Sequence, residues 1–359
     1  MGGGVMVMAG GTGGHVFPAL AVARALRERG REVLWLGTPG SFESRVVPGH
    51  GFPMELVNLR GLRGNGIGGW LGAPFMIGYA LLRSLAILRR HRPSLVLGMG
   101  GFVTGPGGVA ARLLGVPLVI HEQNAVPGMT NQWLARAADR VLEAFPGSFD
   151  ARRRARLTGN PVRAEIALLP PPEQRLAGRA GPLRLLVLGG SLGAQALNET
   201  LPGALARLDV TQRPEVRHQA GRGKERATAD AYAAAGVEAQ VLPFLSEMDQ
   251  AYAWADLVVC RAGALTVAEL AAAGVGSILV PYPHAVDDHQ TRNAGYLADQ
   301  GAARLLPQDQ MNAERLAQML RPLLEGREAV RAMARRARDL ALPGATAAVV
   351  AACEEVIGG

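Results

Sequence analysis

The feature that most constrains the fold is an apolar strand pattern that runs directly into a glycine-rich loop. Residues 5–8 are valine and methionine, and residues 10–14 contain four glycines. Such an apolar run is typical of a buried parallel strand, and the glycines permit a tight turn and close approach of the backbone to a ligand. Pro18 suits the first turn of the helix predicted next, and Gly30 ends that helix.

A strand, a glycine loop and a helix in this order make a natural seat for phosphate. The loop presents backbone N–H groups at the positive end of a helix. A purely structural turn is the alternative interpretation. His15, which follows the loop directly, is unexpected in a phosphate cradle because such a cradle needs no imidazole.

The same order recurs in the second half of the chain. Residues 183–188 form a strand pattern, residues 189–194 a second glycine loop, and a helix pattern continues to about Leu208. Between the two halves, Pro161 and the proline-rich stretch 169–182 indicate a domain boundary. A chain of 359 residues is long enough for two domains. We therefore predict an α/β protein of two doubly wound, Rossmann-like domains.

Composition narrows the class of partner. The chain has 38 basic and 30 acidic residues, a net charge of +8, which favours a phosphorylated or polyanionic partner. Nucleic acid is disfavoured because the basic residues are scattered and only 5% of residues are aromatic. Two cysteines, Cys260 and Cys353, argue against a disulfide scaffold and fit a reducing compartment. The first thirty residues contain no secretory signal pattern, so we expect a cytoplasmic protein.

An uncharged stretch between Arg63 and Arg83 departs from the α/β alternation. It is rich in aliphatic and aromatic residues, but its glycines and Pro74 make it a poor membrane-spanning helix. We predict a loop and helix over 66–92 that expose apolar side chains beside arginines, as suits an anionic membrane surface. A helix packed in the core with a solvated basic end is the alternative.

Polar residues gather where strands of the first half end. A strand pattern over 94–99 leads into the glycine-rich segment 100–108, and one over 117–120 leads into His121, Glu122, Gln123 and Asn124. The carboxyl ends of strands are where open α/β sheets bind ligands. Four hydrogen-bonding side chains there suit a polyhydroxylated ligand, whereas capping of the helix after Pro127 is the structural alternative.

The second half offers a comparable strand end. The strand pattern 257–260 leads into the segment 261–269, which brings backbone amides to a helix start. Glu269 is suited to accept hydrogen bonds from ribose hydroxyls, although its spacing from Thr266 is also that of a capping box. Asp287, Asp288 and His289 are consecutive, and adjacent residues rarely converge on one ion, so we expect no metal site.

Seven motifs in this order resemble the MurG family, bacterial transferases that add N-acetylglucosamine to a lipid-linked muramyl peptide. The resemblance covers essentially the whole chain and implies the GT-B fold, in which two Rossmann-like domains face a central cleft. It implies an acceptor- and membrane-side domain over 1–161 plus 341–359, with the last helix crossing back, and a UDP-N-acetylglucosamine-binding domain over 162–340. The motifs are residues 10–15, 100–108, 121–124, 159–163, 189–194, 261–269 and 288–290.

The activity implied is an inverting hexosyl transfer without a cofactor. N-acetylglucosamine would move from UDP-N-acetylglucosamine to the C4 hydroxyl of undecaprenyl-diphosphate-linked muramyl-pentapeptide, a step of peptidoglycan synthesis at the cytoplasmic face of the bacterial inner membrane. A UDP-N-acetylglucosamine 2-epimerase, which shares the fold, is the alternative. It would leave the apolar and basic stretch without a purpose. A dinucleotide oxidoreductase is disfavoured because residues 11–14 do not fit the required glycine register.

The resemblance also assigns site residues. Uracil would lie near Phe244 and Leu245, ribose near Glu269, and the diphosphate near Ser191 and the helix start at Leu265. Some family members carry two glutamines where this chain has His289 and Gln290, and Gln290 is the predicted sugar contact. The donor set is Arg163, Ser191, Phe244, Leu245, Ala264, Leu265, Thr266, Val267, Ala268, Glu269 and Gln290, and the groups reaching the sugar from the other domain are Thr12, Gly13, Gly14 and Asn124.

The chemistry calls for a base on the attacking hydroxyl, worth about 10²–10⁴-fold in rate. His15 is the candidate, with Glu122 as the runner-up. A second interpretation has His15 bind a phosphate of the acceptor, whose diphosphate we place at residues 10–15 and 100–108. The leaving UDP needs charge stabilisation, which helix amides and Arg163 can supply without a metal ion.

Overall fold

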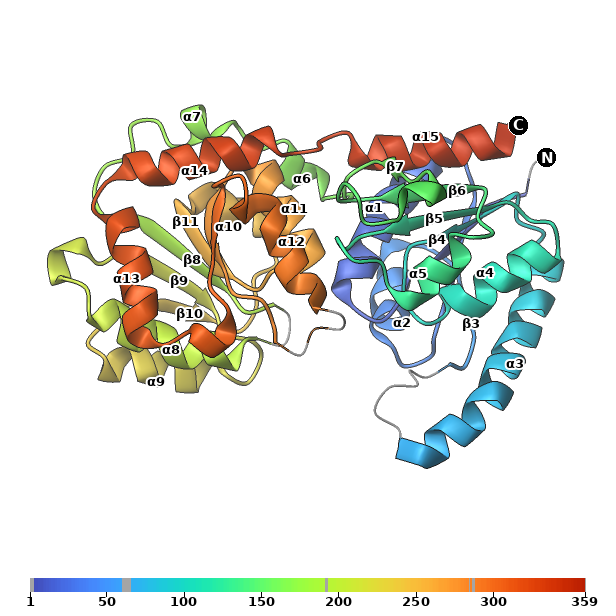
Figure 1. The fold of residues 1–359 in the computed structure, drawn as a ribbon, viewed down its shortest axis with the longest axis horizontal. Helices are drawn as coiled ribbons and strands as arrows, with labels where there is room; N and C mark the ends of the chain where they lie inside the picture. Colours follow the sequence, from blue (N-terminus) through green and yellow to red (C-terminus); the bar gives the residue numbers. More distant parts are fainter. Residues whose placement is uncertain (1–2, 60–65, 191–192, 284, 286–287, 359) are drawn as a thin grey trace. The chain divides into compact units, whose positions relative to one another are not determined.

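The computed structural model describes residues 3–59, 66–190, 193–283, 285 and 288–358, with the backbone alone for 66–72. The chain divides into two compact units (Figure 1): Met1–Arg163 with Pro343–Gly359, and Ala164–Leu342. The sequence prediction set the boundaries at 161 and 341. Both breaks therefore fall two residues later than predicted, and Arg163 lies in the first unit.

The first unit is built on a wholly parallel sheet of seven strands in the order β3-β2-β1-β4-β5-β6-β7. The edge strands β3 and β7 are short and were not predicted. The strands are β1 (Val5–Met8), β2 (Val33–Gly37), β3 (Met54–Leu56), β4 (Leu95–Gly98), β5 (Leu118–Glu122), β6 (Arg140–Glu143) and β7 (Arg156–Leu157).

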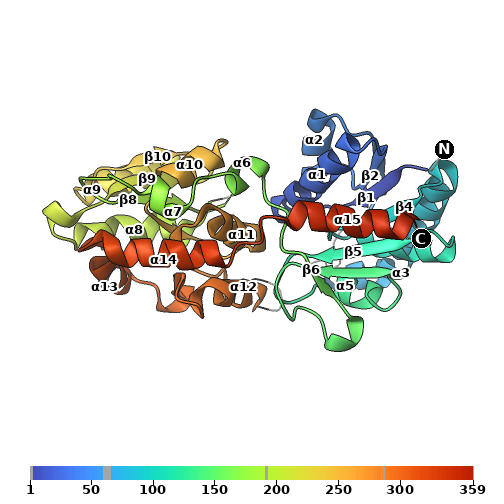
Figure 2. The ribbon, with the colours of Figure 1, turned by 90° about the horizontal axis from the view of Figure 1, so that it is seen from above.

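Helices cover both faces of this sheet, because side chains alternate along each buried strand. Val5 and Val7 of β1 pack in one cluster with α1 and α15, whereas Met6 and Met8 pack in another with α3 and α4. The C-terminal helix α15 lies against α1 (Figure 2). The helices are α1 (Gly13–Glu28), α2 (Phe42–Val46), α3 (Gly66–His91), α4 (Thr104–Leu113), α5 (Met129–Leu134) and α15 (Ala345–Gly358), with 3-10 turns η1 (Val47–His50) and η2 (Ala151–Arg153).

Two predicted helix starts were wrong. Helix α1 begins at Gly13, so Pro18 lies inside it and not in its first turn. Proline has no N–H to donate to the Gly14 carbonyl four residues earlier, but its fixed φ is compatible with a helix. Helix α3 is one continuous helix from Gly66 that includes Pro74, where a loop followed by a helix was expected.

The second unit repeats the architecture with six parallel strands in the order β10-β9-β8-β11-β12-β13. The strands are β8 (Arg184–Leu188), β9 (Glu215–Gln219), β10 (Gln240–Leu242), β11 (Leu257–Cys260), β12 (Gly276–Leu279) and β13 (Ala303–Leu305). The helices are α6 (Ala164–Ala167), α7 (Pro172–Arg175), α8 (Gln195–Ala206), α9 (Glu225–Ala234), α10 (Met248–Trp254), α11 (Ala264–Ala273), α12 (His289–Ala298), α13 (Ala313–Leu324) and α14 (Arg327–Asp339), with 3-10 turns η3 (Val210–Gln212) and η5 (Gln308–Gln310).

Each sheet has a point where the strand order reverses. In the first unit it lies between β1 and β4, and in the second between β8 and β11. Doubly wound sheets bind ligands outside the carboxyl ends of the strands at such a point. The predicted glycine loops follow β1, β4 and β8, three of these four strands. Among the residues described, none of the helices has both the length and the apolar character needed to cross a bilayer.

A buried carboxylate organises the start of the second unit. Asp256, which is 1% exposed, accepts hydrogen bonds from the guanidinium groups of Arg179 and Arg327 at 2.6 and 3.0 Å. Its second oxygen also accepts from the backbone N–H of Arg184 at the start of β8. One carboxylate thus ties the segment that enters the unit to helix α14 and to the sheet.

Replacing Asp256 with asparagine should destabilise the second unit by about 3–5 kcal/mol, because two partly buried arginines lose their counter-charge. Urea unfolding measures the loss. The matched control is Glu314→Gln in the same unit, whose ion pair with Arg207 is about half exposed and should cost less than about 1 kcal/mol. Equal effects of the two substitutions would contradict this account.

Candidate functional site

Two glycine loops meet at the carboxyl edge of the first sheet. The Gly10 N–H donates to the Gly100 carbonyl oxygen at 3.2 Å. A Cβ placed on Gly101 would lie 2.6 Å from the Gly10 oxygen, and Gly101 has a φ of +93°. Real Cβ atoms do not approach so closely, and that φ favours glycine. The loops after β1 and β4 therefore touch through backbone alone.

A buried glutamate, Glu43, fixes the shape of the glycine loop after β1. Glu43 of α2 is 1% exposed; its Oε2 accepts from the Gly11 N–H at 3.0 Å and its Oε1 from the Thr38 N–H at 3.1 Å. The indole N–H of Trp35 donates to the Ala9 carbonyl at the end of β1. Sequence reasoning missed Glu43, whose only signal is a carboxylate shortly after a strand end.

The amino end of α1 carries no side-chain cap. Thr12 is the N-cap residue in extended conformation and is exposed, Gly13 and Gly14 form the first helical positions, and the first turn contains no acidic residue. The helix therefore presents its partial positive charge without a neutralising side chain of its own. This arrangement is suited to an anionic group.

His15 lies in the first turn of α1 and is half buried. Its Nδ1 is 3.0 Å from Oε1 of Gln123. A Cβ on Gly100, whose φ is +95°, would lie 2.6 Å from the same nitrogen. The imidazole therefore lies against the bare Gly100 backbone and one buried amide. The sequence placed Gln123 among the polar residues 121–124 suited to a polyhydroxylated ligand, but did not predict its contact with His15.

Glu122 at the end of β5 is 2% exposed and accepts four hydrogen bonds. Its Oε1 accepts from the backbone and side-chain amides of Asn124, and its Oε2 from the Gly128 N–H and the Asn131 side chain. Gly128 is the N-cap residue of α5. The helix-capping alternative thus holds for Glu122, while Asn124 is half buried and oriented by it.

Arg163 lies close to the first helix of its own unit. Its guanidinium carbon is 5.4 Å from the centre of the Phe17 ring, within the range of a cation–π contact. Phe17 in turn packs edge-on against Phe42.

The predicted helix start after β11 is confirmed at Ala264, with Gly263 as the N-cap residue and no side-chain cap. Thr266 and Glu269 therefore stand inside the helix, and the capping-box alternative is wrong. Ala264, Leu265 and Val267 are buried, whereas Thr266 and Ala268 are partly accessible. As in α1, the first turn of α11 has no acidic residue.

The other residues predicted to bind the donor also follow strand ends of the second sheet. Glu269 is 4% exposed and its Oε2 accepts from the Tyr252 hydroxyl at 3.2 Å. Beyond β10, Phe244 is exposed beneath the guanidinium of Arg222 at 5.7 Å, and Leu245 is partly buried.

Gln290 lies in the first turn of α12, beyond β12. Its Oε1 accepts from the Tyr282 N–H at 2.9 Å, which fixes the amide. Asp288 accepts from the Thr291 hydroxyl. Ser191 and Asp287 lie outside the described residues. Within the part of the chain that the structure describes, no three His, Cys, Asp or Glu side chains are grouped as metal ligands.

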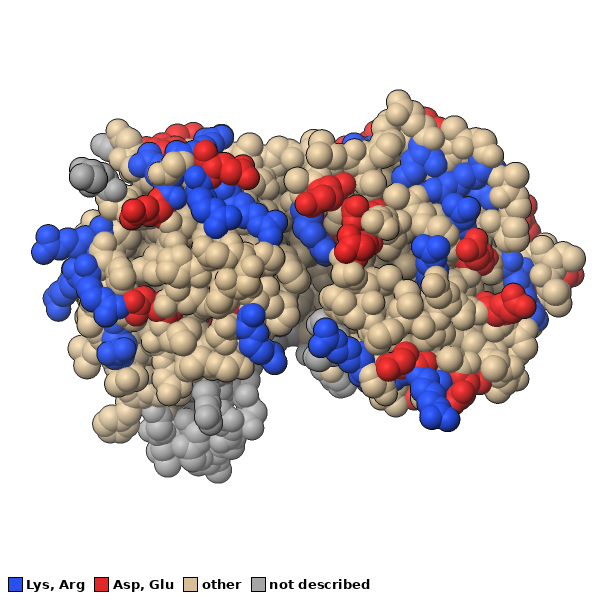
Figure 3. Space-filling view, turned by 180° about the vertical axis from the view of Figure 1, so that it is seen from behind, with Lys and Arg blue, Asp and Glu red and all other residues tan. Residues whose placement is uncertain are grey.

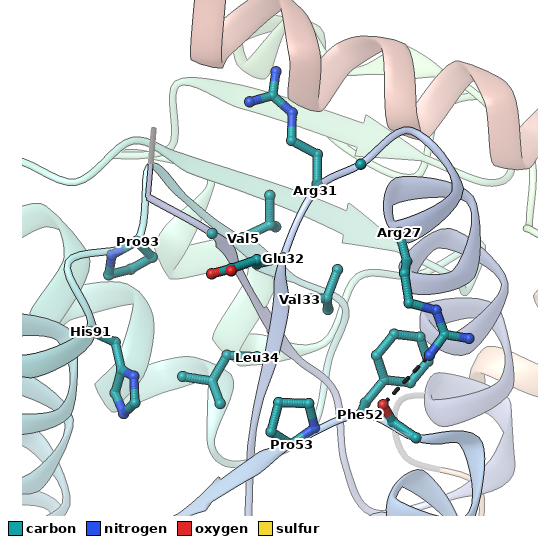
Figure 4. Close-up of a pocket in the computed structure, with 13 residues that line it drawn as sticks. Val5, Arg27, Arg31, Glu32, Val33, Leu34, Phe52, Pro53, His91 and Pro93 are labelled. Carbon is teal, nitrogen blue, oxygen red and sulfur yellow. Dashed lines mark hydrogen bonds between the residues drawn. The ribbon is translucent and has the colours of Figure 1, made fainter. Parts of the chain in front are cut away.

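A hollow at the opposite edge of the first sheet contains none of the predicted residues (Figure 4). Val5, Val33 and Pro93, which line it, lie at or just before the amino ends of strands. Arg27 there stacks on the Phe52 ring at 4.4 Å. Open α/β sheets bind ligands at the carboxyl ends of their strands, so we place the functional site at the glycine loops.

Two buried histidines, His121 and His218, form hydrogen bonds near the strand ends and are held in the neutral form. His121 donates from Nε2 to the Gly159 carbonyl, and His218 of β9 contacts the Tyr232 hydroxyl and Asn198 Oδ1. Burial lowers the pKa of each to about 4, and for His121 the charge of His15 adds to this effect. Asn198 also donates to the Ala220 carbonyl, close to Gly193 of the second loop.

Acidification should destabilise both units through these histidines. An ordinary histidine pKa is about 6.5, so the folded state binds fewer protons than the unfolded state between pH 6.5 and 4. Stability is therefore complete above pH 6.5 and falls as the pH drops. Each unit should lose about 2 kcal/mol between pH 7 and 5.

Urea unfolding as a function of pH measures this slope. His121→Gln and His218→Gln should each flatten it, even where they lower stability at pH 7. If neither substitution changes the dependence of stability on pH, His121 and His218 are not the groups responsible.

Comparison with known proteins identifies the family. The chain matches the glycosyltransferase family 28 N-terminal domain over residues 5–143 and the C-terminal domain over 184–349. It is 57% identical over 354 residues to a protein of Marinobacter nauticus named UDP-N-acetylglucosamine--N-acetylmuramyl-(pentapeptide) pyrophosphoryl-undecaprenol N-acetylglucosamine transferase, covering 99% of this chain and 98% of that one.

Solved structures agree with this match. The crystal structure of Acinetobacter baumannii MurG superposes with a TM-score of 0.87 at 44% identity, over 98% of this chain and 99% of that one. A putative UDP-N-acetylglucosamine 2-epimerase from Listeria monocytogenes gives a TM-score of 0.69 at 15% identity, over 99% and 96%, and shares the fold alone. The chain belongs to glycosyltransferase family 28 and has its two-domain GT-B fold.

Proposed function

We propose that this chain transfers N-acetylglucosamine from UDP-N-acetylglucosamine to the C4 hydroxyl of undecaprenyl-diphosphate-linked muramyl-pentapeptide, with inversion, in peptidoglycan synthesis. The observation that carries the proposal is 57% identity, over nearly the whole of both chains, to a transferase named for this donor and acceptor. The epimerase alternative is not favoured, because its structural relative is only 15% identical.

The second unit is the proposed donor site. Phe244 and Leu245 would meet uracil, Glu269 the ribose, and Gln290 the sugar, while Ser191 and residues 264–268 would meet the diphosphate. Support comes from their placement, since the described members of this set follow the carboxyl ends of β10, β11 and β12. Tyr252 donates to one Glu269 oxygen and so restricts the orientation of the carboxylate.

The first unit is the proposed acceptor site. The uncapped start of α1 and the adjoining loop 100–108 would receive the acceptor's diphosphate, and Asn124 would reach the sugar. Arg163 would supply a fixed positive charge to the departing UDP, because a guanidinium remains protonated throughout. These charges suit a metal-independent transfer.

His15 is the proposed base on the attacking hydroxyl. It is half buried in the first turn of α1, and its Nδ1 is engaged with Gln123. Glu122, the runner-up, has both oxygens engaged by four donors. A base needs a lone pair that the hydroxyl can reach. Both Glu122 oxygens already accept hydrogen bonds, whereas the contact with Gln123 involves only one of the two His15 nitrogens, so the geometry favours His15.

Helix α3 is the proposed contact with an anionic membrane at the cytoplasmic face of the inner membrane. Ala80, Ser84 and Leu88 are buried on one face of the helix, which packs on α4. Phe75 and Leu82 are 83% and 67% exposed on another. The helix packs one apolar face and exposes another. The interpretation as a helix packed in the core and the interpretation as an exposed apolar surface therefore each describe one face of it.

Cationic side chains accompany this exposed apolar face. Tyr79 is 52% exposed, and Arg83, Arg89 and Arg90 follow it as exposed residues. Apolar side chains flanked by arginines suit insertion at an anionic bilayer surface. Elsewhere, on the face shown in Figure 3, basic side chains are interspersed with acidic and uncharged ones, a pattern that does not favour nucleic acid.

Replacing His15 with alanine should lower kcat by about 10²–10⁴-fold, because the hydroxyl loses its base, while the KM for UDP-N-acetylglucosamine stays within a few fold. The assay is UDP release with the lipid acceptor. A rise in acceptor KM with kcat intact would instead indicate a phosphate ligand, and turnover within a few fold of wild type would exclude the base role.

Incubation with UDP-N-acetylglucosamine alone separates the transferase from the epimerase. We expect neither UDP release nor sugar conversion until the lipid acceptor is added. Conversion of the nucleotide sugar to its C2 epimer without acceptor would overturn the proposed reaction.

Replacing Phe75 and Leu82 together with serine should weaken binding to phosphatidylglycerol vesicles at least about tenfold, since each buried side chain contributes about 1.5–3 kcal/mol. Vesicle sedimentation measures the binding. The matched control is Leu168→Ser, which removes an 81% exposed leucine from the second unit. An equal loss in both variants would count against α3 as the membrane contact.

A further inference from the structure

The side chain that contacts His15 is itself fixed in orientation. Gln123 follows β5 and is 1% exposed. Its Nε2 donates to the Met99 carbonyl at 2.8 Å, and its Oε1 faces His15 Nδ1 at 3.0 Å. Its own backbone carbonyl accepts from the side chain of Asn160. Three neighbours thus surround one buried glutamine.

The Met99 carbonyl decides which way the Gln123 amide points. A carbonyl oxygen can only accept a hydrogen bond. The reversed amide would set the glutamine oxygen 2.8 Å from the Met99 oxygen with no hydrogen between them, which is unfavourable in a buried site. The group facing His15 is therefore the glutamine oxygen, an acceptor.

The orientation of Gln123 in turn sets the proton of His15. An acceptor at 3.0 Å from Nδ1 requires that Nδ1 carry hydrogen. In the neutral imidazole the lone pair is then on Nε2. Gly100 adds a steric constraint, because its missing side chain leaves the room that Nδ1 occupies.

We propose that Gln123 is a positioning residue that holds His15 in the Nδ1–H tautomer, so that Nε2 is the nitrogen that takes the proton from the acceptor hydroxyl. The tautomer assignment rests on geometry alone, and its catalytic use rests on the proposed role of His15. A base with its lone pair on the wrong nitrogen cannot act, and for this reason fixing the tautomer contributes to rate.

The tautomer is measured directly by ¹⁵N–¹H correlation spectra of histidine-labelled protein, about two pH units above the ordinary histidine pKa. The chain has seven histidines, and comparison with His15→Ala assigns the signal. We expect the wild type to show hydrogen on Nδ1 and Gln123→Met to lose this preference. Hydrogen on Nε2 in the wild type would overturn the proposal.

Turnover tests the catalytic consequence through a double-mutant cycle. Gln123→Met, close in volume but without the amide, should lower kcat about 10–100-fold with the donor KM within threefold. In the His15→Ala background, Gln123→Met should cost less than about twofold more, because its partner is gone.

Two outcomes separate the possible failures. An equal loss from Gln123→Met with and without His15 would show that Gln123 merely supports the loop, and would overturn the positioning role. If His15→Ala retains turnover, the base assignment fails, whereas the spectra still decide whether Gln123 fixes the tautomer. Thermal unfolding of each variant identifies losses caused by misfolding.

Discussion

The close approach of two backbones at the carboxyl edge of the first sheet is the constraint on which the candidate site depends. Gly10 and Gly101 come within a distance that no side chain permits, and the loops after β1 and β4 therefore lie together. His15 fits against Gly100 for the same reason. Any Cβ at these positions would separate the loops and displace the imidazole. The glycines therefore determine where the His15 side chain can lie.

Buried carboxylates also shape this edge of the sheet. Glu43 accepts from backbone N–H groups at Gly11 and Thr38, and Glu122 accepts from backbone N–H groups at Asn124 and Gly128. A buried carboxylate left without donors is costly, so each loop is pinned by the need to satisfy it. The candidate catalytic groups stand on segments with little freedom to move.

The sequence predicted the fold where local pattern suffices. Central strands such as β1 and β11 are buried on both faces and read as continuous apolar runs, whereas β3, β7 and β13 have two or three residues and no pattern. The role of Gln123 could not be predicted, because its contact with His15 joins positions 108 residues apart. Glu43 reaches Gly11 across 32 residues. Helix α3 was ambiguous because it both packs and exposes apolar side chains.

The glycine loops of the two units differ in the residue that follows them, and this difference bears on which unit binds which substrate. The order Gly-Gly-Thr-Gly-Gly-His at 10–15 corresponds to Gly-Gly-Ser-Leu-Gly-Ala at 189–194. Helix α1 begins at Gly13, so His15 lies in its first turn, whereas Ala194 at the matching position is the N-cap residue that precedes α8. Of the two, the first places an imidazole in the opening turn of the helix that follows it. Because an inverting transfer needs a base on the attacking hydroxyl and charge stabilisation on the leaving group, this asymmetry favours acceptor activation in the first unit and donor binding in the second.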